Sequence, residues 1–343
     1  MKKVVVVGGG FVGSRVSKAL ENKFDLTLVD TKDYFEFTPS ILRTLVEPGH
    51  IKKIQVKHKD YLKKANIIND HAHELGGNYI KTSKENIRFD YLVIAVGSEY
   101  GSPIKEEDVL SAQRAEELRD YHHRLVESDS VAIIGGGLVG VELAAEICER
   151  FPKKKLFLIH SKDRLIERNR VASSEYCRKF LEKRGVNIIL NERGIVRKKE
   201  VLLKNSDKKI KADLIFSAVG IKPNSECADA NFSQDIDDIG CFRVNDFLQL
   251  SGRENIFVGG DVVGLREEKT AQAAERHAEV IVYNINAIES QRPLRKYFHK
   301  RRPLIISLGK RDGILETRNF ILKGYLTSIL KNFVEWKSMK GYL

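Results

Sequence analysis

Two glycine-rich turns with identical spacing are the part of this sequence that could do chemistry. They read VVVVGGGFVG (4–13) and VAIIGGGLVG (131–140), and each lies between an apolar strand and a helical stretch. This arrangement places the pyrophosphate of a dinucleotide on the helix N-terminus. The glycines of the Gly-X-Gly-X-X-Gly pattern are Gly8, Gly10 and Gly13, and then Gly135, Gly137 and Gly140. Two such units predict two bound dinucleotides, FAD and NADH or NADPH.

The strand after each turn ends in a different residue. Asp30 ends the first, and its carboxylate can accept the ribose hydroxyls of FAD. His160 ends the second, followed by Ser161 and Lys162, where an acid would favour NADH. These residues and Arg164 could instead tolerate the 2′-phosphate of NADPH, or form a solvated turn. The choice between NADH and NADPH stays open at this point.

Two later apolar segments end in the tripeptide AVG. They are FDYLVIAVGS (89–98) and KADLIFSAVGIKPN (211–224), one for each unit. Both are typical of the strand that closes a dinucleotide-binding domain and leads to the other domain. We therefore expect Gly97 and Gly220 to contact the cofactors.

A third apolar strand, NIFVGGDVVG (255–264), ends in Gly260 and Asp261. A buried aspartate at this place can hydrogen-bond the ribityl chain of a flavin. The segment 269–288 then predicts a long helix whose first turn contains Ala271. The positive end of that helix would point at the flavin N1–O2 locus, where negative charge develops on reduction.

The order of these motifs predicts an α/β fold with two Rossmann-like dinucleotide-binding domains, the second inserted in the first. We expect the first part of the FAD domain at 1–106, the NAD(P)H domain at 107–230 and the second part of the FAD domain at 231–295. A short C-terminal region, 296–343, ends in an amphipathic helix.

The tail FILKGYLTSILKNFVEWKSMKGYL carries apolar residues at helical three- and four-residue spacings. They are Leu326, Ile329, Leu330, Phe333 and Trp336, and lysines at 331, 337 and 340 lie between or beyond them. The pattern favours a helix in a membrane interface with tryptophan at headgroup depth. Docking on the body of the protein or on a second subunit, as in a homodimer, would give the same pattern.

Composition narrows the classes of function. The net charge is +12, but the basic residues are scattered without aromatic interleaving, so nucleic acid is not an expected partner. The four cysteines form no CxxC motif, which argues against a redox-active disulfide, and no metal site is expected. MKKVVVV leads directly into the first strand, so we expect no cleavable signal, and no run of about 18 apolar residues occurs. We expect a cytoplasmic protein, peripheral on the cytoplasmic face of a membrane.

Taken together, these motifs resemble the two-dinucleotide flavoprotein superfamily. YFEFTPSILRTLVEP (34–48) resembles a segment of type II NADH dehydrogenases. KTAQAAERHA (269–278) resembles their quinone-site helix, with Arg276 where a second glutamine usually stands. VNDFLQLSGRENIFVGGDVVG, SLGKRDG and WKSMK resemble the ferroptosis-suppressor branch of apoptosis-inducing-factor-like proteins, which are NAD(P)H:quinone oxidoreductases.

The resemblance implies a hydride transfer from NAD(P)H to flavin, followed by transfer of two electrons to a quinone or another small acceptor. It places Glu142 near the nicotinamide carboxamide. Gln272 is then a candidate for the quinone pocket, and Lys331 for proton supply or headgroup attraction. Two other functions stay open: a reductase of a soluble electron carrier such as ferredoxin, and a non-enzymatic flavoprotein that senses nicotinamide.

Overall fold

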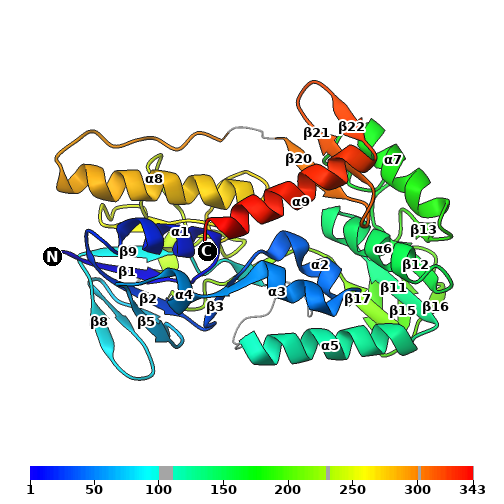
Figure 1. Cartoon of the computed structure of the whole chain (residues 1–343), viewed down its shortest axis with the longest axis horizontal. Helices are drawn as coiled ribbons and strands as arrows, with labels where there is room; N and C mark the ends of the chain where they lie inside the picture. The colour runs from blue at the N-terminus through cyan, green and yellow to red at the C-terminus, as the bar shows by residue number, and fades with distance from the viewer. Residues whose placement is uncertain (100–110, 229–231, 300–302, 343) are drawn as a thin grey trace.

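The computed structural model describes residues 1–99, 111–228, 232–299 and 303–342. Two sheet-based units lie side by side, and the C-terminal helix runs from one to the other (Figure 1). The expected domain boundaries at 106/107 and 230/231 fall outside the described residues.

The first unit is built on a five-stranded parallel sheet. Its strand order is β19-β9-β1-β2-β5, so the strand that follows the second unit returns to pair with β9. Helices α1 (Phe11–Leu20) and α8 (Ala271–Glu289) pack against each other over this sheet (Figure 1). The strands are β1 (Lys3–Val7), β2 (Asp25–Asp30), β5 (Asn66–Asn69), β9 (Tyr91–Ile94) and β19 (Ile256–Val258).

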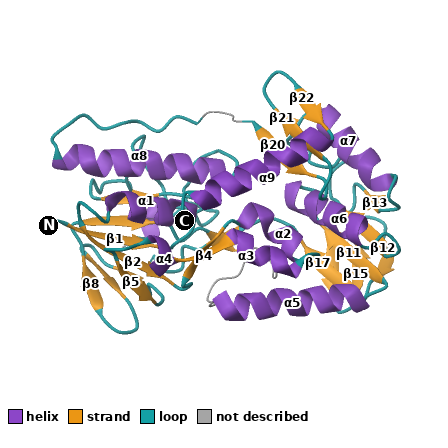
Figure 2. Cartoon of the chain, in the orientation of Figure 1, coloured by secondary structure: helices purple, strands orange, loops and turns teal. Residues whose placement is uncertain are grey.

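The second unit repeats the plan with four parallel strands in the order β13-β12-β11-β17. They are β11 (Ser130–Ile134), β12 (Lys155–Ile159), β13 (Asn187–Ile189) and β17 (Leu214–Ser217). Its helices are α5 (Ser111–Glu127), α6 (Leu138–Arg150) and α7 (Val171–Glu182), and a small antiparallel sheet is formed by β14 (Gly194–Arg197), β15 (Glu200–Leu203) and β16 (Lys209–Lys211) (Figure 2). The predicted fold class is therefore confirmed.

Short elements connect the two units. Between them lie α2 (Ile41–Thr44) and α3 (Ile51–Ile54), preceded by the 3₁₀ turns η1 (Thr38–Ser40) and η2 (Pro48–His50). The chain crosses between the units beside the pair β10 (Ser98–Glu99) and β18 (Lys222–Pro223). The remaining short elements are β3 (Tyr34–Glu36), β4 (Gln55–Lys57), α4 (His58–Tyr61), β6 (Glu74–Leu75), β7 (Tyr79–Lys81), β8 (Asn86–Arg88) and η3 (Ser233–Asp235).

The C-terminal region adds a sheet that the sequence patterns did not predict. Strands β20 (Leu304–Ser307), β21 (Gly313–Glu316) and β22 (Ile321–Lys323) form an antiparallel sheet beside the second unit. Helix α9 (Tyr325–Lys340) starts there and ends over α1 of the first unit, as the red ribbon in Figure 1 shows. The helix expected in the tail is thus present. No helix among the described residues is long and apolar enough to cross a membrane.

Both parallel sheets are buried on their two faces. Val4, Val5 and Val6 of β1 are almost fully inaccessible to solvent, as are Val131, Ala132 and Ile133 of the equivalent strand β11. One face of each sheet packs on helices, and the other packs on apolar residues of the small antiparallel strands, such as Ile80 in the first unit and Val201 in the second. This explains why these strands read as continuous apolar runs.

Candidate functional site

Each glycine turn needs its first and third glycine for steric reasons. Gly8 has φ 95°, and a Cβ there would lie 2.4 Å from the carbonyl oxygen of Ala95. A Cβ on Gly13 would lie 1.7 Å from the carbonyl oxygen of Gly8. The second turn has the same geometry: a Cβ on Gly140 would lie 1.8 Å from the carbonyl oxygen of Gly135. Only glycine permits the helix to pack so closely on the strand.

The second glycine of each turn has a different role. Gly10 and Gly137 are the N-caps of α1 and α6, and neither helix end has a side-chain cap. A Cβ at either glycine would meet nothing within 4 Å. The first N–H groups of both helices therefore face open space, which fits the binding of a pyrophosphate.

One continuous cavity of about 2510 Å³ runs along both turns. The sequence-predicted residues that line it, from both units and the tail, are Gly8, Gly10, Asp30, Gly97, Gly135, Gly137, Glu142, His160, Gly220, Gly260, Asp261, Ala271, Gln272 and Lys331. Gly13 and Gly140 lie behind the turns, where they serve helix packing. Among the described residues, no group of three or more His, Cys, Asp or Glu could hold a metal ion.

At the end of β2, the carboxylate of Asp30 is held by a buried histidine. Nε2 of His58 lies 2.8 Å from Oδ2 of Asp30, and Nδ1 lies 2.7 Å from the hydroxyl of Tyr61. Burial raises the pKa of Tyr61 above its ordinary value, so its hydroxyl stays protonated and donates to Nδ1. The proton on Nε2 then faces Asp30, which fixes the carboxylate at the position expected for a ribose ligand.

The end of β19 leads to the predicted Gly260–Asp261 corner. The hydroxyl of Ser98 donates to Oδ2 of Asp261 at 2.7 Å, and the N–H of Gly260 donates to Nδ1 of His277 at 3.1 Å. Helix α8 begins nearby, and the hydroxyl of its N-cap, Thr270, accepts the N–H of Ala273. The corner and the helix N-terminus thus line the cavity together.

Gln272 and Arg276 lie on the first turns of α8. The side-chain amide of Gln272 donates to the carbonyl oxygen of Pro303 at 3.1 Å. The Arg276 guanidinium donates to the carbonyl oxygen of Phe298 and lies 5.2 Å from the ring centre of Tyr297. Both side chains line the cavity and contact backbone carbonyl oxygens of residues that precede β20.

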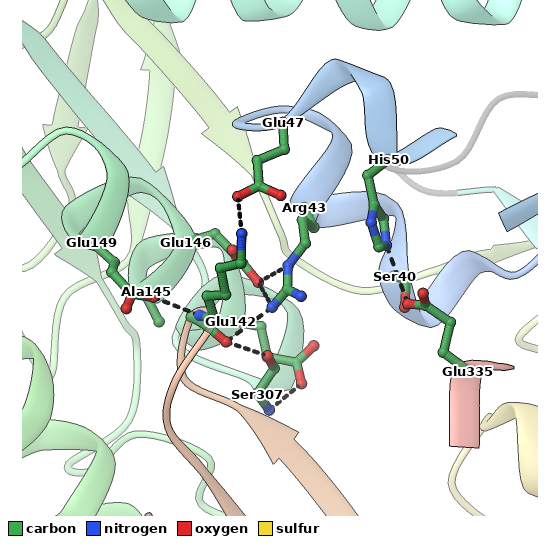
Figure 3. A network of polar contacts seen from close by, with 12 residues as sticks. Ser40, Arg43, Glu47, His50, Glu142, Ala145, Glu146, Glu149, Ser307 and Glu335 are labelled. Atoms are coloured by element: carbon green, nitrogen blue, oxygen red, sulfur yellow. Dashed lines mark hydrogen bonds and ion pairs between the residues drawn. The ribbon is translucent and has the colours of Figure 1, made fainter. Parts of the chain in front are cut away.

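Glu142 lies just after the first turn of α6, and its Oε1 accepts the backbone N–H of Ser307 at 2.7 Å (Figure 3). Burial raises the pKa of this carboxyl, while the positive charge of Lys331 and the Ser307 hydrogen bond act in the opposite direction. Residues from α6, β20 and α9 thus meet at one point of the cavity. The two candidates from distant parts of the sequence, Glu142 and Lys331, are brought together by the fold.

Beside this point lies an ion pair that sequence reasoning missed. Arg43 on α2 contacts Oε1 of Glu146 at 3.1 Å, and their side chains are only 7% and 5% exposed. The same guanidinium, which Figure 3 shows beside Glu146, donates to the carbonyl oxygen of Gly309 at 3.0 Å. Glu146 follows Glu142 by one helical turn, and this i, i+4 spacing of two acids among the apolar residues of α6 was the available signal.

Helix α9 is held by a second missed contact. Oε2 of Glu335 lies 3.1 Å from Nε2 of His50 and also accepts the hydroxyl of Ser40 (Figure 3). Burial alone would raise the pKa of Glu335, but His50, Ser40 and the charge of Lys331 lower it below its ordinary value. The helix is therefore anchored by a buried polar contact to η1 and η2.

The end of the tail docks on the first glycine turn. The Tyr342 hydroxyl lies 2.9 Å from the hydroxyl of Ser14, which in turn donates to the carbonyl oxygen of Gly10 at 2.7 Å. The Tyr342 ring stacks on Phe35 with centroids 4.2 Å apart and meets Tyr61 edge-on. Part of the tail therefore packs against the body of the protein. This is one of the alternatives that the helical spacing of the tail left open.

The four cysteines, all in the described part of the chain, are free. Burial raises the pKa of Cys148 and of Cys177 to about 12, so both remain thiols at neutral pH. A thiol is a poor nucleophile in disulfide exchange. The structure thus gives no redox-active disulfide among these residues.

At the end of β12, His160 lines the cavity. Its basic neighbours Lys162 and Arg164, which were candidates for binding a 2′-phosphate, are not among the described residues that line it. The Arg164 guanidinium donates to the carbonyl oxygens of Glu167 and Asn169. The suggestion that Arg164 receives a 2′-phosphate is not supported by these contacts, because the side chain already binds its own loop.

Comparison with known proteins agrees with this geometry. Residues 2–278 match the family described as pyridine nucleotide-disulphide oxidoreductase. The chain belongs to this family. The resemblance read from the motifs is therefore confirmed, and the chain is an FAD-dependent NAD(P)H oxidoreductase.

Two similar proteins cover almost the whole chain. Apoptosis-inducing factor homolog A of Dictyostelium discoideum is 31% identical, with 96% of this chain and 89% of the relative covered. Human ferroptosis suppressor protein 1 is 30% identical, with 98% of this chain and 95% of the relative covered.

Two solved structures share the fold. NDH2 from Plasmodium falciparum in complex with NADH has a TM-score of 0.87 at 15% identity, covering 100% of this chain and 95% of that chain. The sulfide:quinone oxidoreductase of Aquifex aeolicus has a TM-score of 0.82 at 21% identity, covering 98% of this chain and 90% of that chain. At these identities the likeness concerns the fold alone.

Proposed function

We propose that this oxidoreductase passes electrons from NAD(P)H to a quinone at a membrane surface, with FAD in the first unit and the nicotinamide nucleotide in the second. The observation that carries the proposal is the orientation of α9. This helix lines the cavity with one face and exposes large apolar side chains on another.

The two faces of α9 are the reverse of those of an ordinary surface helix. The face turned to the protein buries the polar side chains of Thr327, Ser328 and Glu335 together with Met339. The large apolar side chains of α9 that are 40% to 65% exposed to solvent are those of Tyr325, Leu326, Ile329, Phe333, Val334 and Trp336. An exposed apolar stripe of this kind marks an interaction site, and flanking lysines favour an anionic lipid surface.

The neighbouring hairpin extends the apolar surface. Phe320, in the turn before β22, and Leu322, in β22 itself, are exposed, and β22 packs next to α9. Lys323, Lys337 and Lys340 are also exposed, and Lys340 lies over the ring of Trp336 at 5.0 Å. Aromatic side chains beside lysines are typical of the headgroup region of a membrane.

The cavity reaches this surface from inside. Lys331, Val334 and Ser338, on successive turns of α9, line the cavity, and Val334 is exposed as well. A hydrophobic acceptor dissolved in lipid could therefore reach the cavity beside α9 without crossing water. This is the arrangement that a quinone reductase requires.

Several side chains have roles in this proposal. Bound FAD would take a hydride from the nicotinamide and return two electrons to the acceptor. Glu142 orients the nicotinamide carboxamide, Gln272 contacts the acceptor headgroup, and Lys331 attracts or protonates it. One protein with the same fold is named a sulfide:quinone oxidoreductase, so this fold can serve a quinone acceptor.

The acceptor is tested by steady-state turnover of the purified protein with NADH and NADPH, each with a short-chain quinone, ferricyanide or an acidic ferredoxin. We expect quinone to support turnover. Stimulation by ferredoxin without stimulation by quinone would favour a soluble carrier. Absence of turnover with every acceptor, in protein that contains FAD, would favour a sensor.

The membrane is tested by co-sedimentation with anionic vesicles. The double change Phe333→Ser and Trp336→Ser removes apolar side chains from the exposed face and spares Glu335 and Tyr342. Val171→Ser, at an exposed apolar residue of α7, is the matched control. We expect the double variant to lose vesicle binding and long-chain quinone turnover but to keep ferricyanide reduction. Equal sedimentation of all forms would contradict the membrane role.

A further inference from the structure

The histidine at the end of β12 holds an acid from elsewhere in the second unit. Nδ1 of His160 accepts the backbone N–H of Gly136 at 3.1 Å. A ring nitrogen that accepts carries no proton, so the proton lies on Nε2. Nε2 lies 3.2 Å from Oε2 of Glu167 and donates to it. The imidazole therefore holds a carboxylate beside the glycine turn.

The loop that carries Glu167 has anchors of its own. The N–H of Ile166 donates to the carbonyl oxygen of Gly136 at 2.8 Å. Ile166 has φ 44°, a conformation that β-branched residues rarely adopt, so the surrounding contacts must hold the loop in place. The Arg164 guanidinium adds hydrogen bonds to the carbonyl oxygens of Glu167 and Asn169. The position of Glu167 is thus determined from both sides.

Glu167 also faces the cavity. Its side chain is 32% exposed and lines the cavity together with Gly137 and His160. In a dinucleotide-binding unit, the adenine ribose lies at the end of the strand that follows the glycine turn. A carboxylate there accepts the 2′- and 3′-hydroxyls and repels a 2′-phosphate.

We propose that Glu167, positioned by His160, selects NADH over NADPH by taking the role of the acid that is missing from the end of β12. This inference rests on the placement of the nicotinamide nucleotide in the second unit, made under the proposed function. Glu192, a second acid in this part of the cavity, is buried, and its Oε2 already accepts the N–H of Asn205.

Basic side chains nearby would favour the opposite selectivity. Arg168, Arg170 and Arg193 line the cavity and are exposed to solvent. The Arg170 guanidinium donates to the carbonyl oxygen of Arg318 at 3.0 Å. A 2′-phosphate bound to these arginines would lie beside the negatively charged Glu167 carboxylate. Because two like charges repel at this distance, we expect Glu167 to decide the selectivity.

The test measures binding of two probes that lack nicotinamide, ADP-ribose and its 2′-phosphate, to the FAD-loaded protein by calorimetry. Wild type should prefer ADP-ribose. Glu167→Gln should weaken ADP-ribose binding about ten- to a hundredfold, as expected for loss of a charged hydrogen-bond acceptor. It should leave binding of the 2′-phosphate unchanged or improved. The ratio of kcat/KM for NADH and NADPH should shift in the same direction.

Glu175→Gln is the matched control, because Glu175 is an exposed glutamate on α7. It should change neither affinity. A Glu167→Gln variant with both wild-type affinities would overturn the role of Glu167 while leaving the nicotinamide site intact. A wild type that prefers the 2′-phosphate, with this preference lost in Arg168→Gln, would overturn it in favour of the arginines. Absence of binding of both probes to wild type would instead contradict the placement of the nicotinamide nucleotide.

The role of His160 as a positioning residue needs a separate readout. His160→Asn should reduce the preference for ADP-ribose in the wild-type background. In the Glu167→Gln background the same change should leave the ratio of the two affinities unaltered, because the residue acts through Glu167. Equal effects of His160→Asn in both backgrounds would show that His160 only supports the turn.

Discussion

The two glycine turns place a histidine–carboxylate pair at the same point, with the two partners exchanged. In the first unit the acid, Asp30, ends the strand, and His58 comes from a later helix to hold it at 2.8 Å. In the second unit the histidine, His160, ends the strand and holds Glu167 from a later loop at 3.2 Å. The acid or the histidine can therefore occupy the end of the strand in this type of unit. A sequence pattern that requires an acid at the strand end detects only the first arrangement.

The residues just after the third glycine differ in what they contact. Ser14 follows Gly13 and meets Tyr342 of the tail, whereas the equivalent residue of the second unit is the buried Val141. The next position holds Arg15, which pairs with Glu275 at 2.5 Å, in the first unit and Glu142 in the second. The first helix is therefore covered by the tail and α8, while the second presents a carboxylate to the cavity.

The largest effect should come from substitutions that block one or the other of the two glycine-rich turns. Gly10→Val and Gly137→Val add side chains where the unliganded fold has space but a pyrophosphate must approach. We expect Gly10→Val to be purified without FAD and Gly137→Val to keep FAD but not be reduced by NAD(P)H. Flavin absorbance and anaerobic reduction measure both. A yellow Gly10→Val protein would show that FAD does not bind at the first turn.

A second experiment compares the equivalent positions 142 and 15. Glu142→Gln should slow flavin reduction by NAD(P)H about tenfold or more, because a misplaced nicotinamide loses the geometry of hydride transfer. Reoxidation by quinone should change little. Arg15→Gln is the matched control and should leave flavin reduction at its wild-type rate. Stopped-flow traces with normal reduction but slow reoxidation in Glu142→Gln would contradict the assignment.

The contact between Tyr342 of the tail and the glycine turn occurs only in the first unit. Substitutions of Tyr342 measure how much this contact contributes to stability. Tyr342→Ala removes a buried ring stacked on Phe35, so we expect a loss of about 3 kcal/mol in the free energy of unfolding and weaker FAD retention. Tyr342→Phe removes only the hydroxyl contact with Ser14 and should cost about 1 kcal/mol. Thermal melting followed by flavin fluorescence separates the two. Unchanged FAD release in Tyr342→Ala would show that the tail does not support the first turn.

Another histidine–carboxylate pair, His50 and Glu335, has no part in either turn, and its loss should have a smaller effect than Tyr342→Ala. The folded state lowers the pKa of Glu335 below 4.5, so this carboxylate stabilises the fold above that pH and loses its contribution as the pH falls below it. Glu335→Gln should cost about 1–2 kcal/mol at pH 7. The variant should also lose less stability than wild type as the pH falls below 4.5, measured by urea unfolding. An unchanged pH profile would show that the pair contributes little.

The sequence by itself determined the fold class, the two turns and the order of the units. These features depend on local rules: a glycine where a Cβ would clash at 1.7 Å, an apolar run that forms a buried parallel strand, and helical spacing in the tail. The family follows from the same residues. Each signal lies within a short stretch of chain, so no knowledge of distant contacts is needed to read it.

Only the tertiary structure decided which side chains meet. Glu142 and Lys331 are separated by more than half of the chain, yet they face one point of the cavity. The structure also showed that the polar face of α9 is buried and the apolar face exposed, which helical spacing cannot distinguish. Likewise, a search for an acid at the strand end could not find Glu167, because the position of its loop depends on backbone contacts with Gly136. Such pairings arise from packing between distant segments, which a local pattern does not encode.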